Sequence, residues 1–76
     1  MKEILETIIT TLVSDKEAVA IKQIDGEQSV IFEVKVADAD MGKIIGKQGV
    51  VAKSIRTIMK AVASKENKRV SVEFLD

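Results

Sequence analysis

Apolar residues in this 76-residue chain alternate between a helical and a strand-like spacing, which restricts the chain to few folds. Residues 4–13 carry apolar side chains at helical intervals, and this pattern predicts an amphipathic helix. Residues 18–24 are rich in β-branched side chains and end at Asp25-Gly26, a strong turn dipeptide. Every second residue of 30–36 is apolar and suited to a core. We therefore expect a helix followed by a β-hairpin.

The second half of the chain predicts two more helices and one more strand. Residues 38–45 fit a short helix that begins at one of two possible aspartate N-caps. The helical pattern resumes at residues 49–64, and residues 70–74 alternate as a last strand. A connection that passes through two helices makes the strands on either side of it parallel. The prediction is an α+β fold with the order α-β-β-α-α-β, in which helices cover one face of a three-stranded mixed sheet. Residues 1–76 are expected to form a single domain.

Two residue types that support catalysis and metal binding are missing. The chain has no cysteine, so neither a disulfide nor a zinc-thiolate site can support the small core. It also has no histidine, the commonest general base and metal ligand. No carboxylate pair or nucleophile with its base can be assembled from the remaining residues. We expect no enzyme activity, no metal and no cofactor.

The apolar segments are too short for a membrane. None approaches the roughly 20 apolar residues that span a bilayer. Glu3 and Glu6 interrupt the N-terminal apolar residues, which argues against a signal peptide. The sequence therefore predicts a cytoplasmic protein that does not associate with membranes.

Charges are divided unevenly along the chain, although the formal net charge is zero. Residues 1–40 hold four lysines and nine acidic residues, which gives a net charge of −5. Residues 41–69 hold eight basic residues and one glutamate, a net charge of +7, and residues 70–76 add two acids. The middle segment therefore predicts a cationic surface that attracts an anionic partner.

A short motif, Ile44-Ile45-Gly46-Lys47-Gln48-Gly49, lies between the two later helices. Glycines without Cβ atoms let a phosphate approach the backbone N–H groups closely. The following helix begins here, and its free N–H groups and dipole favour an anion, to which Lys47 adds charge. A glycine pair at this spacing can also be only a turn between helices. The spacing fits neither the P-loop nor the dinucleotide-binding fingerprint, because the glycines lie at 42, 46 and 49.

Basic residues share one face of the helix that starts at this motif. Lys53, Arg56 and Lys60 lie three and four residues apart, so they project from the same side. A charged stripe is usually only a solvated face. Here, however, the stripe carries one sign without any interspersed glutamate, which favours an anion-binding surface.

These residues resemble those of KH domains, whose core motif is I-I-G-x-x-G. The element order resembles the type II KH fold, and the whole chain is similar to the small stand-alone bacterial KH proteins of the KhpA type. The resemblance implies a loop that clamps about four nucleotides of single-stranded RNA along their backbone, beside an apolar groove that reaches the last strand near Arg69 and Val70. Ala52 stands where many KH repeats carry a larger aliphatic residue, which predicts a shallower groove. The predicted RNA-binding residues are Lys43, Ile45, Gly46, Lys47, Gln48, Gly49, Lys53 and Arg56.

Base recognition in this groove is expected to rest on apolar contacts and hydrogen bonds. Trp and Tyr are absent, and both Phe residues lie in strands with inward alternation. Aromatic stacking platforms of the RRM kind are therefore not expected.

Self-association is also predicted. Apolar residues of the last helix cover more of its circumference than one buried stripe requires, and Val51, Ile58 and Ala61 lie at one margin. Linking a weak RNA site to a second one raises the overall affinity for RNA. The extra apolar surface thus predicts a homodimer, and the resemblance implies a heterodimer with a larger KH-containing RNA-binding protein of the KhpB type. The resemblance also implies roles as an RNA chaperone or post-transcriptional regulator, and in cell-wall elongation and cell shape. The alternative is a protein-interaction adaptor in which the glycine loop is structural.

Overall fold

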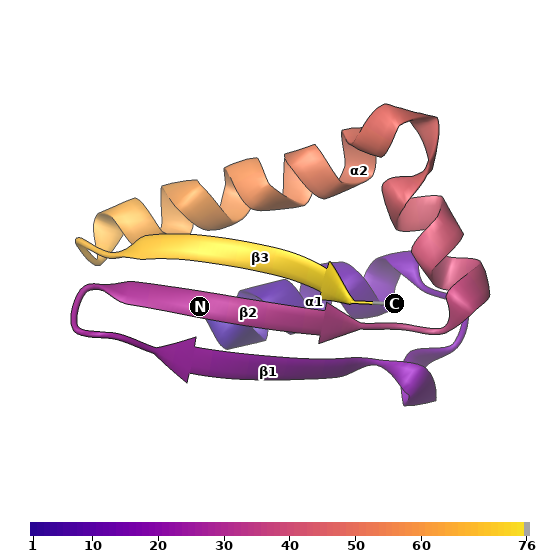
Figure 1. Ribbon diagram of the computed structural model, residues 1–76, viewed down its shortest axis with the longest axis horizontal. Helices are drawn as coiled ribbons and strands as arrows, with labels where there is room; N and C mark the ends of the chain where they lie inside the picture. The colour runs from indigo at the N-terminus through magenta and orange to yellow at the C-terminus, as the bar shows by residue number, and fades with distance from the viewer. Residues whose placement is uncertain (76) are drawn as a thin grey trace.

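The computed structural model describes residues 1–75, and Asp76, the last residue of the predicted domain, lies outside the described residues. The elements follow the predicted order (Figure 1). They are α1 (Lys2–Leu12), β1 (Ala20–Asp25), β2 (Ser29–Lys35), α2 (Asp38–Lys65) and β3 (Arg69–Leu75), with a 3-10 turn, η1 (Lys16–Ala18), that was not predicted. Backbone angles within α2 leave the helical range at residues 46–49, so its two parts correspond to the two predicted helices.

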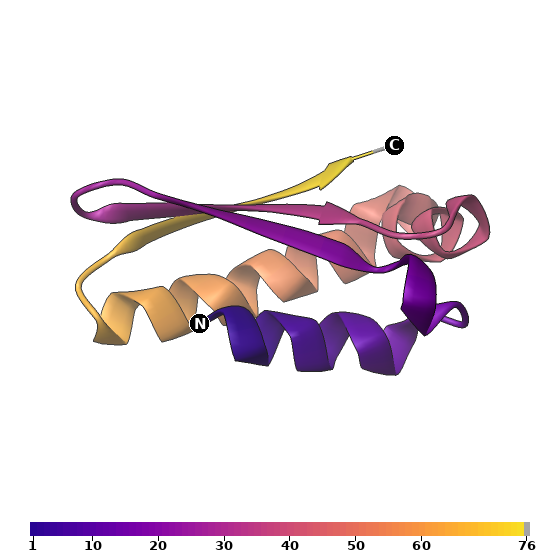
Figure 2. The ribbon, with the colours of Figure 1, turned by 90° about the horizontal axis from the view of Figure 1, so that it is seen from below.

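The three strands form one mixed sheet in the order β1-β2-β3. The predicted hairpin pairs β1 with β2 in antiparallel fashion, and its turn is closed by the Gly26 N–H, which donates to the Ser29 carbonyl (2.8 Å). The long connection through α2 makes β3 parallel to β2. Both helices lie on the same face of the sheet (Figure 2). The predicted α+β fold is confirmed.

The core lies between that face of the sheet and the two helices. The inward residues of β2 predicted by alternation are buried, and Phe32 at their centre is 0% exposed. A phenylalanine buried to this degree contributes about 3 to 5 kcal/mol relative to alanine. This is a large share of the stability that a small domain can reach. Core side chains from the helices are Leu5 and Ile9 of α1, and Met41, Ile44, Ala52, Ile55 and Met59 of α2.

The first turn of α2 differs from the prediction, because neither aspartate caps it. The N-cap is Ala37, and within residues 1–75 the helix start has no side-chain cap hydrogen bond. Asp40 is instead buried, and its carboxylate accepts hydrogen bonds from the backbone N–H groups of Ser14 (2.9 Å) and Asp15 (3.0 Å). These two bonds, with a smaller contribution from Lys43, hold the pKa of Asp40 below its ordinary value. Asp40 thus ties the segment after α1 to the part of α2 that leads into the glycine loop.

After the end of α2 the chain reverses its direction. Asn67 adopts a left-handed conformation (φ 56°). Its N–H donates to the Ser64 carbonyl (3.1 Å), and the Lys68 N–H donates to the Ala63 carbonyl (3.0 Å). This is the Schellman pattern of helix termination. The reversal places β3 beside the second part of α2 (Figure 1).

None of the helices within residues 1–75 is long and apolar enough to cross a bilayer.

Candidate nucleic-acid interface

The predicted loop is a sharp turn built from left-handed residues. Gly46 is extended (φ −59°, ψ 170°), and Lys47, Gln48 and Gly49 follow with φ values of 54°, 63° and 72°. A residue other than glycine in this conformation is held at a cost of about 1 kcal/mol or more. Two such residues in succession therefore make the loop a locally strained segment. Strain of this kind is concentrated at functional sites.

The two glycines of the loop have different physical reasons for lacking a side chain. Gly49 has a positive φ, which by itself favours glycine. Gly46 has an ordinary φ, and a Cβ added there would meet no other atom within 4 Å. Neither backbone strain nor packing within the protein therefore requires glycine at position 46. Its absent side chain leaves the backbone open to an approaching molecule.

The side chains of the loop are free to meet a ligand. Lys47 and Gln48 are exposed, and within residues 1–75 neither forms a hydrogen bond or an ion pair. The second part of α2 starts directly after Gly49, so its first N–H groups lack partners within the helix and point toward the loop. The positive end of the helix dipole, the open backbone and the Lys47 ammonium thus coincide.

Two further predicted residues flank the loop on its N-terminal side. Ile45 is 46% exposed, as expected for an apolar surface beside the loop. Lys43 is less free than predicted. Its ammonium donates to the Ser14 hydroxyl (2.6 Å) and lies 3.3 Å from an Asp40 carboxylate oxygen. Much of the positive charge of Lys43 is therefore already neutralised within the protein.

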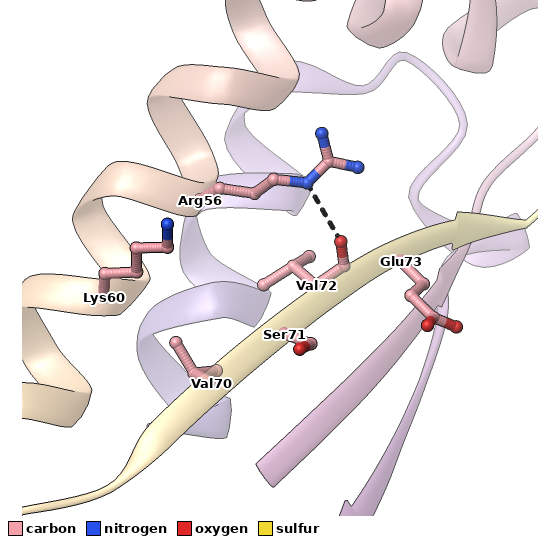
Figure 3. A pocket seen from close by; sticks show the side chains of 6 residues that line it. All are labelled: Arg56, Lys60, Val70, Ser71, Val72 and Glu73. Atoms are coloured by element: carbon pink, nitrogen blue, oxygen red, sulfur yellow. Dashed lines mark hydrogen bonds between the residues drawn. The ribbon is translucent and has the colours of Figure 1, made fainter. Parts of the chain in front are cut away.

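The cationic face of α2 stands over β3. Lys53 and Lys60 are exposed, whereas the Arg56 side chain crosses to the strand and its Nε–H donates to the Val72 carbonyl (3.1 Å; Figure 3). A cavity of about 310 Å³ opens at this place between helix and strand. It is lined by Arg56, Lys60, Val70, Ser71, Val72 and Glu73.

An adjoining cavity continues toward the turn between α2 and β3. It has a volume of about 410 Å³ and shares Lys60, Val70 and Ser71 with the first, while Lys68 and Arg69 line its far part. The structure thus brings Val70 and Arg69 to the groove, as predicted. Lys68 and Ser71 were missed, because no local pattern tells which turn and strand residues face the helix.

Ala52 does not line this groove. It is buried in the core at 4% exposure, although it was expected to make an exposed groove shallower. Its helical phase is that of Ile55 and Met59, the side chains that pack on the sheet. The small size of Ala52 therefore affects the packing of α2 beneath the loop.

A second, apolar groove separates α1 from the other side of α2. Two of the three residues predicted for self-association line it: Ile58 is 45% exposed and Val51 is half-buried. The third, Ala61, is exposed but does not line the groove. Leu12 and Val50, which were not predicted as part of this surface, are 42% and 57% exposed. The groove encloses about 420 Å³ and is lined by Thr7, Ile8, Thr11, Leu12, Val50, Val51, Ser54, Ile55 and Ile58.

The architecture defines the class of protein. A hairpin precedes two helical segments that a glycine-flanked loop connects, and a parallel strand returns beside the second segment. This is a KH domain of the type II arrangement.

Comparison with known proteins gives the particular family. A family model described as "KhpA/KhpB, KH domain" matches residues 2–74. The RNA-binding protein KhpA of Clostridium acetobutylicum is 57% identical over 99% of this chain and 100% of its own length. Its counterpart from Aquifex aeolicus is 42% identical over 100% of this chain and 96% of its own length. No solved structure gives a significant match. The chain belongs to the KhpA/KhpB KH-domain family, which confirms the resemblance seen in the sequence.

Proposed function

We propose that this protein binds single-stranded RNA, with the loop of residues 46–49 holding the phosphates and the bases lying between α2 and β3. The observation that carries the proposal is the open backbone at Gly46, a position at which nothing within the protein requires glycine. Exposed cations of α2 stand beside it, and relatives with 42 to 57% identity are named RNA-binding proteins.

Each predicted residue has a separate role in this proposal. Gly46 and Gly49 let the sugar-phosphate chain approach the backbone, and Lys47 and Gln48 contact the phosphates. Lys53 and Arg56 extend the positive surface along α2, and Ile45 supplies apolar contact beside the loop. Lys43 joins them through its remaining N–H donor, since its ammonium has three donors and contacts Asp40 and Ser14 with the others.

The direct test replaces Lys47 and Gln48 by aspartate and measures binding to a short single-stranded RNA. Two negative charges at the phosphate contacts are expected to weaken binding at least tenfold. The chain offers a matched control, because a second Lys-Gln pair, Lys22-Gln23, is exposed on β1. The same exchange there alters the net charge equally and should leave most of the affinity intact. Unchanged affinity after the loop exchange would refute the proposed site.

The adaptor alternative assigns the loop a purely structural role. Gly49 suits that role, since its positive φ favours glycine, whereas Gly46 has an ordinary φ. Crosslinking in cells followed by recovery of the protein separates the two functions. Recovered RNA supports the binding proposal, whereas recovery of an acidic protein without RNA favours the adaptor.

We also infer that the apolar groove between α1 and α2 is covered by a second KH domain. The partner is a second copy of this chain or the larger KhpB-type protein, since either supplies a second RNA site and raises overall affinity. Exposed Leu12 of α1 and exposed Val50 and Ile58 of α2 support an apolar interface. Val50 and Ile58 lie on a side of α2 away from the cationic face.

The biological role proposed here follows from the family. We propose that residues 1–76 act as one KH domain in the cytoplasm, as an RNA chaperone or post-transcriptional regulator linked to cell-wall elongation and cell shape. No catalytic activity is proposed. Within residues 1–75 the acidic side chains form no group of three or more that is suited to a metal ion.

A further inference from the structure

Arg56 is, within the part of the chain that the structure describes, the groove cation whose side chain hydrogen-bonds to the protein. It starts on α2, and its Nε–H donates to the Val72 carbonyl of β3 (3.1 Å). Its guanidinium carbon lies 5.5 Å from the centre of the Phe74 ring, within the range of a cation–π contact. Lys53 and Lys60, in contrast, form no hydrogen bond or ion pair within residues 1–75. The Arg56 guanidinium is therefore held toward β3 by two contacts, although the residue stays exposed.

Most of the hydrogen-bonding capacity of Arg56 remains free. Within residues 1–75 its Nη groups have no hydrogen-bond or ion-pair partner, and in Figure 3 neither points at another labelled residue. Phe74 contacts the guanidinium but does not line the 310 Å³ cavity that Arg56 borders. Arg56 thus stands between the Phe74 ring and the cavity. The guanidinium carbon thus lies near an aromatic ring, and the same side chain lines open space.

The cavity beside Arg56 suits a flat ring with an attached phosphate. Val70 and Val72 supply apolar surface, and Lys60, one helical turn from Arg56, supplies a second positive charge. A volume of about 310 Å³ lies at the lower end of the range for small-molecule sites, roughly 300 to 1,000 Å³. Bound nucleobases commonly stack on guanidinium planes as well as on aromatic rings.

We propose that Arg56 is a base-stacking platform, which places one nucleobase of a bound single strand against its guanidinium while Phe74 supports the opposite side. The inference rests on the proposed RNA-binding function and adds a defined base subsite to it. It agrees with the expectation that aromatic stacking platforms are absent and adds a stacking surface that is not aromatic. Phe32 is buried and Phe74 is partly covered, so the planar surface comes from an arginine.

The test exchanges the planar cation for a point charge. Arg56→Lys keeps the positive charge but removes the plane. If Arg56 stacks on a base, affinity for a short single-stranded RNA falls about five- to hundredfold, the range for one stacked base. The salt dependence of binding stays the same, because the number of charges is unchanged. Lys22→Arg is the matched control, since Lys22 is exposed on β1, outside the proposed RNA site, and the exchange should alter affinity less than twofold.

A second measurement keeps the test independent of small changes in folding. A series of RNAs, each with one abasic position, is titrated against the wild type and the Arg56→Lys variant at a temperature well below both unfolding transitions. The wild type is expected to lose affinity at one position in particular. The affinity of the Arg56→Lys variant should not fall further at that position, because the variant already lacks the stacking contact with this base. An equal abasic penalty in both proteins would overturn the platform.

The failure of this inference can be told from the failure of RNA binding. If the wild type binds RNA and loses binding on exchange of Lys47 and Gln48, while Arg56→Lys binds like the wild type, the platform is wrong and the loop site stands. If the wild type binds no single-stranded RNA, both are wrong.

Discussion

Gly46 and Gly49 stand three residues apart in one loop, yet side chains at the two positions should have opposite consequences. At position 49 the backbone conformation (φ 72°) favours glycine, whereas at position 46 only the approach of an RNA strand favours it. A single methyl group placed at each position therefore separates the folding role of the loop from its binding role.

Gly49→Ala should destabilise the protein by about 1 to 2 kcal/mol, because alanine in a left-handed conformation is strained. Gly46→Ala should leave the free energy of unfolding within about 0.5 kcal/mol of the wild type, since its φ is ordinary and its surroundings are open. The same Gly46→Ala variant should nevertheless bind RNA more weakly. Urea unfolding and RNA titration of both variants check these expectations. A Gly46→Ala protein with full RNA affinity would contradict the close-approach role of Gly46.

Because of Asp40, the free energy of unfolding should fall when the solution becomes acidic. The folded-state pKa of Asp40 is depressed, so its contribution is present above the unfolded-state value of about 3.9 and is lost as the pH falls through the folded-state value. Asp40→Asn should lower the Tm at pH 7, and the difference from the wild type should shrink below about pH 4. Thermal unfolding between pH 7 and pH 2 measures this. Asp38→Asn, an identical change at an exposed residue of the same turn, should show little of the effect.

At the scale of elements, the second part of α2 has three sides with three different roles. One side packs Ile55 and Met59 into the core, a second carries the cations over β3, and a third presents Val50 and Ile58 to the groove beside α1. Val50 follows Gly49 directly, so the apolar groove begins where the loop ends. A partner on that groove would sit beside the RNA site without covering the cationic side.

Ile58→Lys should abolish self-association, because a partner that covers this groove would bury an unpaired charge. Ile4→Lys is the control, since Ile4 is an exposed isoleucine of α1 (43%, against 45% for Ile58) that does not line the groove. Sedimentation at high micromolar concentration should give a dimer for the wild type and for Ile4→Lys, and a monomer for Ile58→Lys. A monomeric wild type would refute the homodimer, and an unchanged Ile58→Lys dimer would place the interface elsewhere.

At the scale of the whole molecule, zero net charge and a cationic groove coexist because acidic and basic residues occupy different segments. The acidic residues concentrate in the first forty residues, while the cations of residues 41–69 include those of the second part of α2 and of the turn into β3. The attraction felt by a polyanion is therefore local to the groove. Long-range steering of RNA toward the protein should be weak.

Binding should show the modest salt dependence of a small site. Three to four phosphate contacts correspond to a slope of log K against log salt near −2 to −3 for single strands, or roughly −0.7 per contact. Lys53→Ala should reduce the slope by about 0.7. Titrations over about 50 to 200 mM salt measure it. A slope near zero would show that phosphate contacts do not dominate binding.

Much of the fold and the loop could be predicted because their signals are local. Alternation in residues 30–36 identified the buried side of β2, and two glycines around Lys47 and Gln48 marked the break within α2. Helical spacing placed Lys53, Arg56 and Lys60 on one side of a helix. Each of these inferences depends on the side-chain periodicity of a single helix or strand. That periodicity is a local property of the backbone and does not depend on the rest of the chain.

Tertiary structure decided which groups meet across the sequence. Asp40 bonds to a backbone N–H 26 residues away instead of capping its own helix. Arg56 bonds to a carbonyl 16 residues further on and rests on Phe74. Spacing within a segment carries no information about such partners, because they depend on the angle and offset at which helices pack on the sheet. The sequence by itself thus determined the elements and the loop, while packing decided how the cations are held and where an apolar groove stays open.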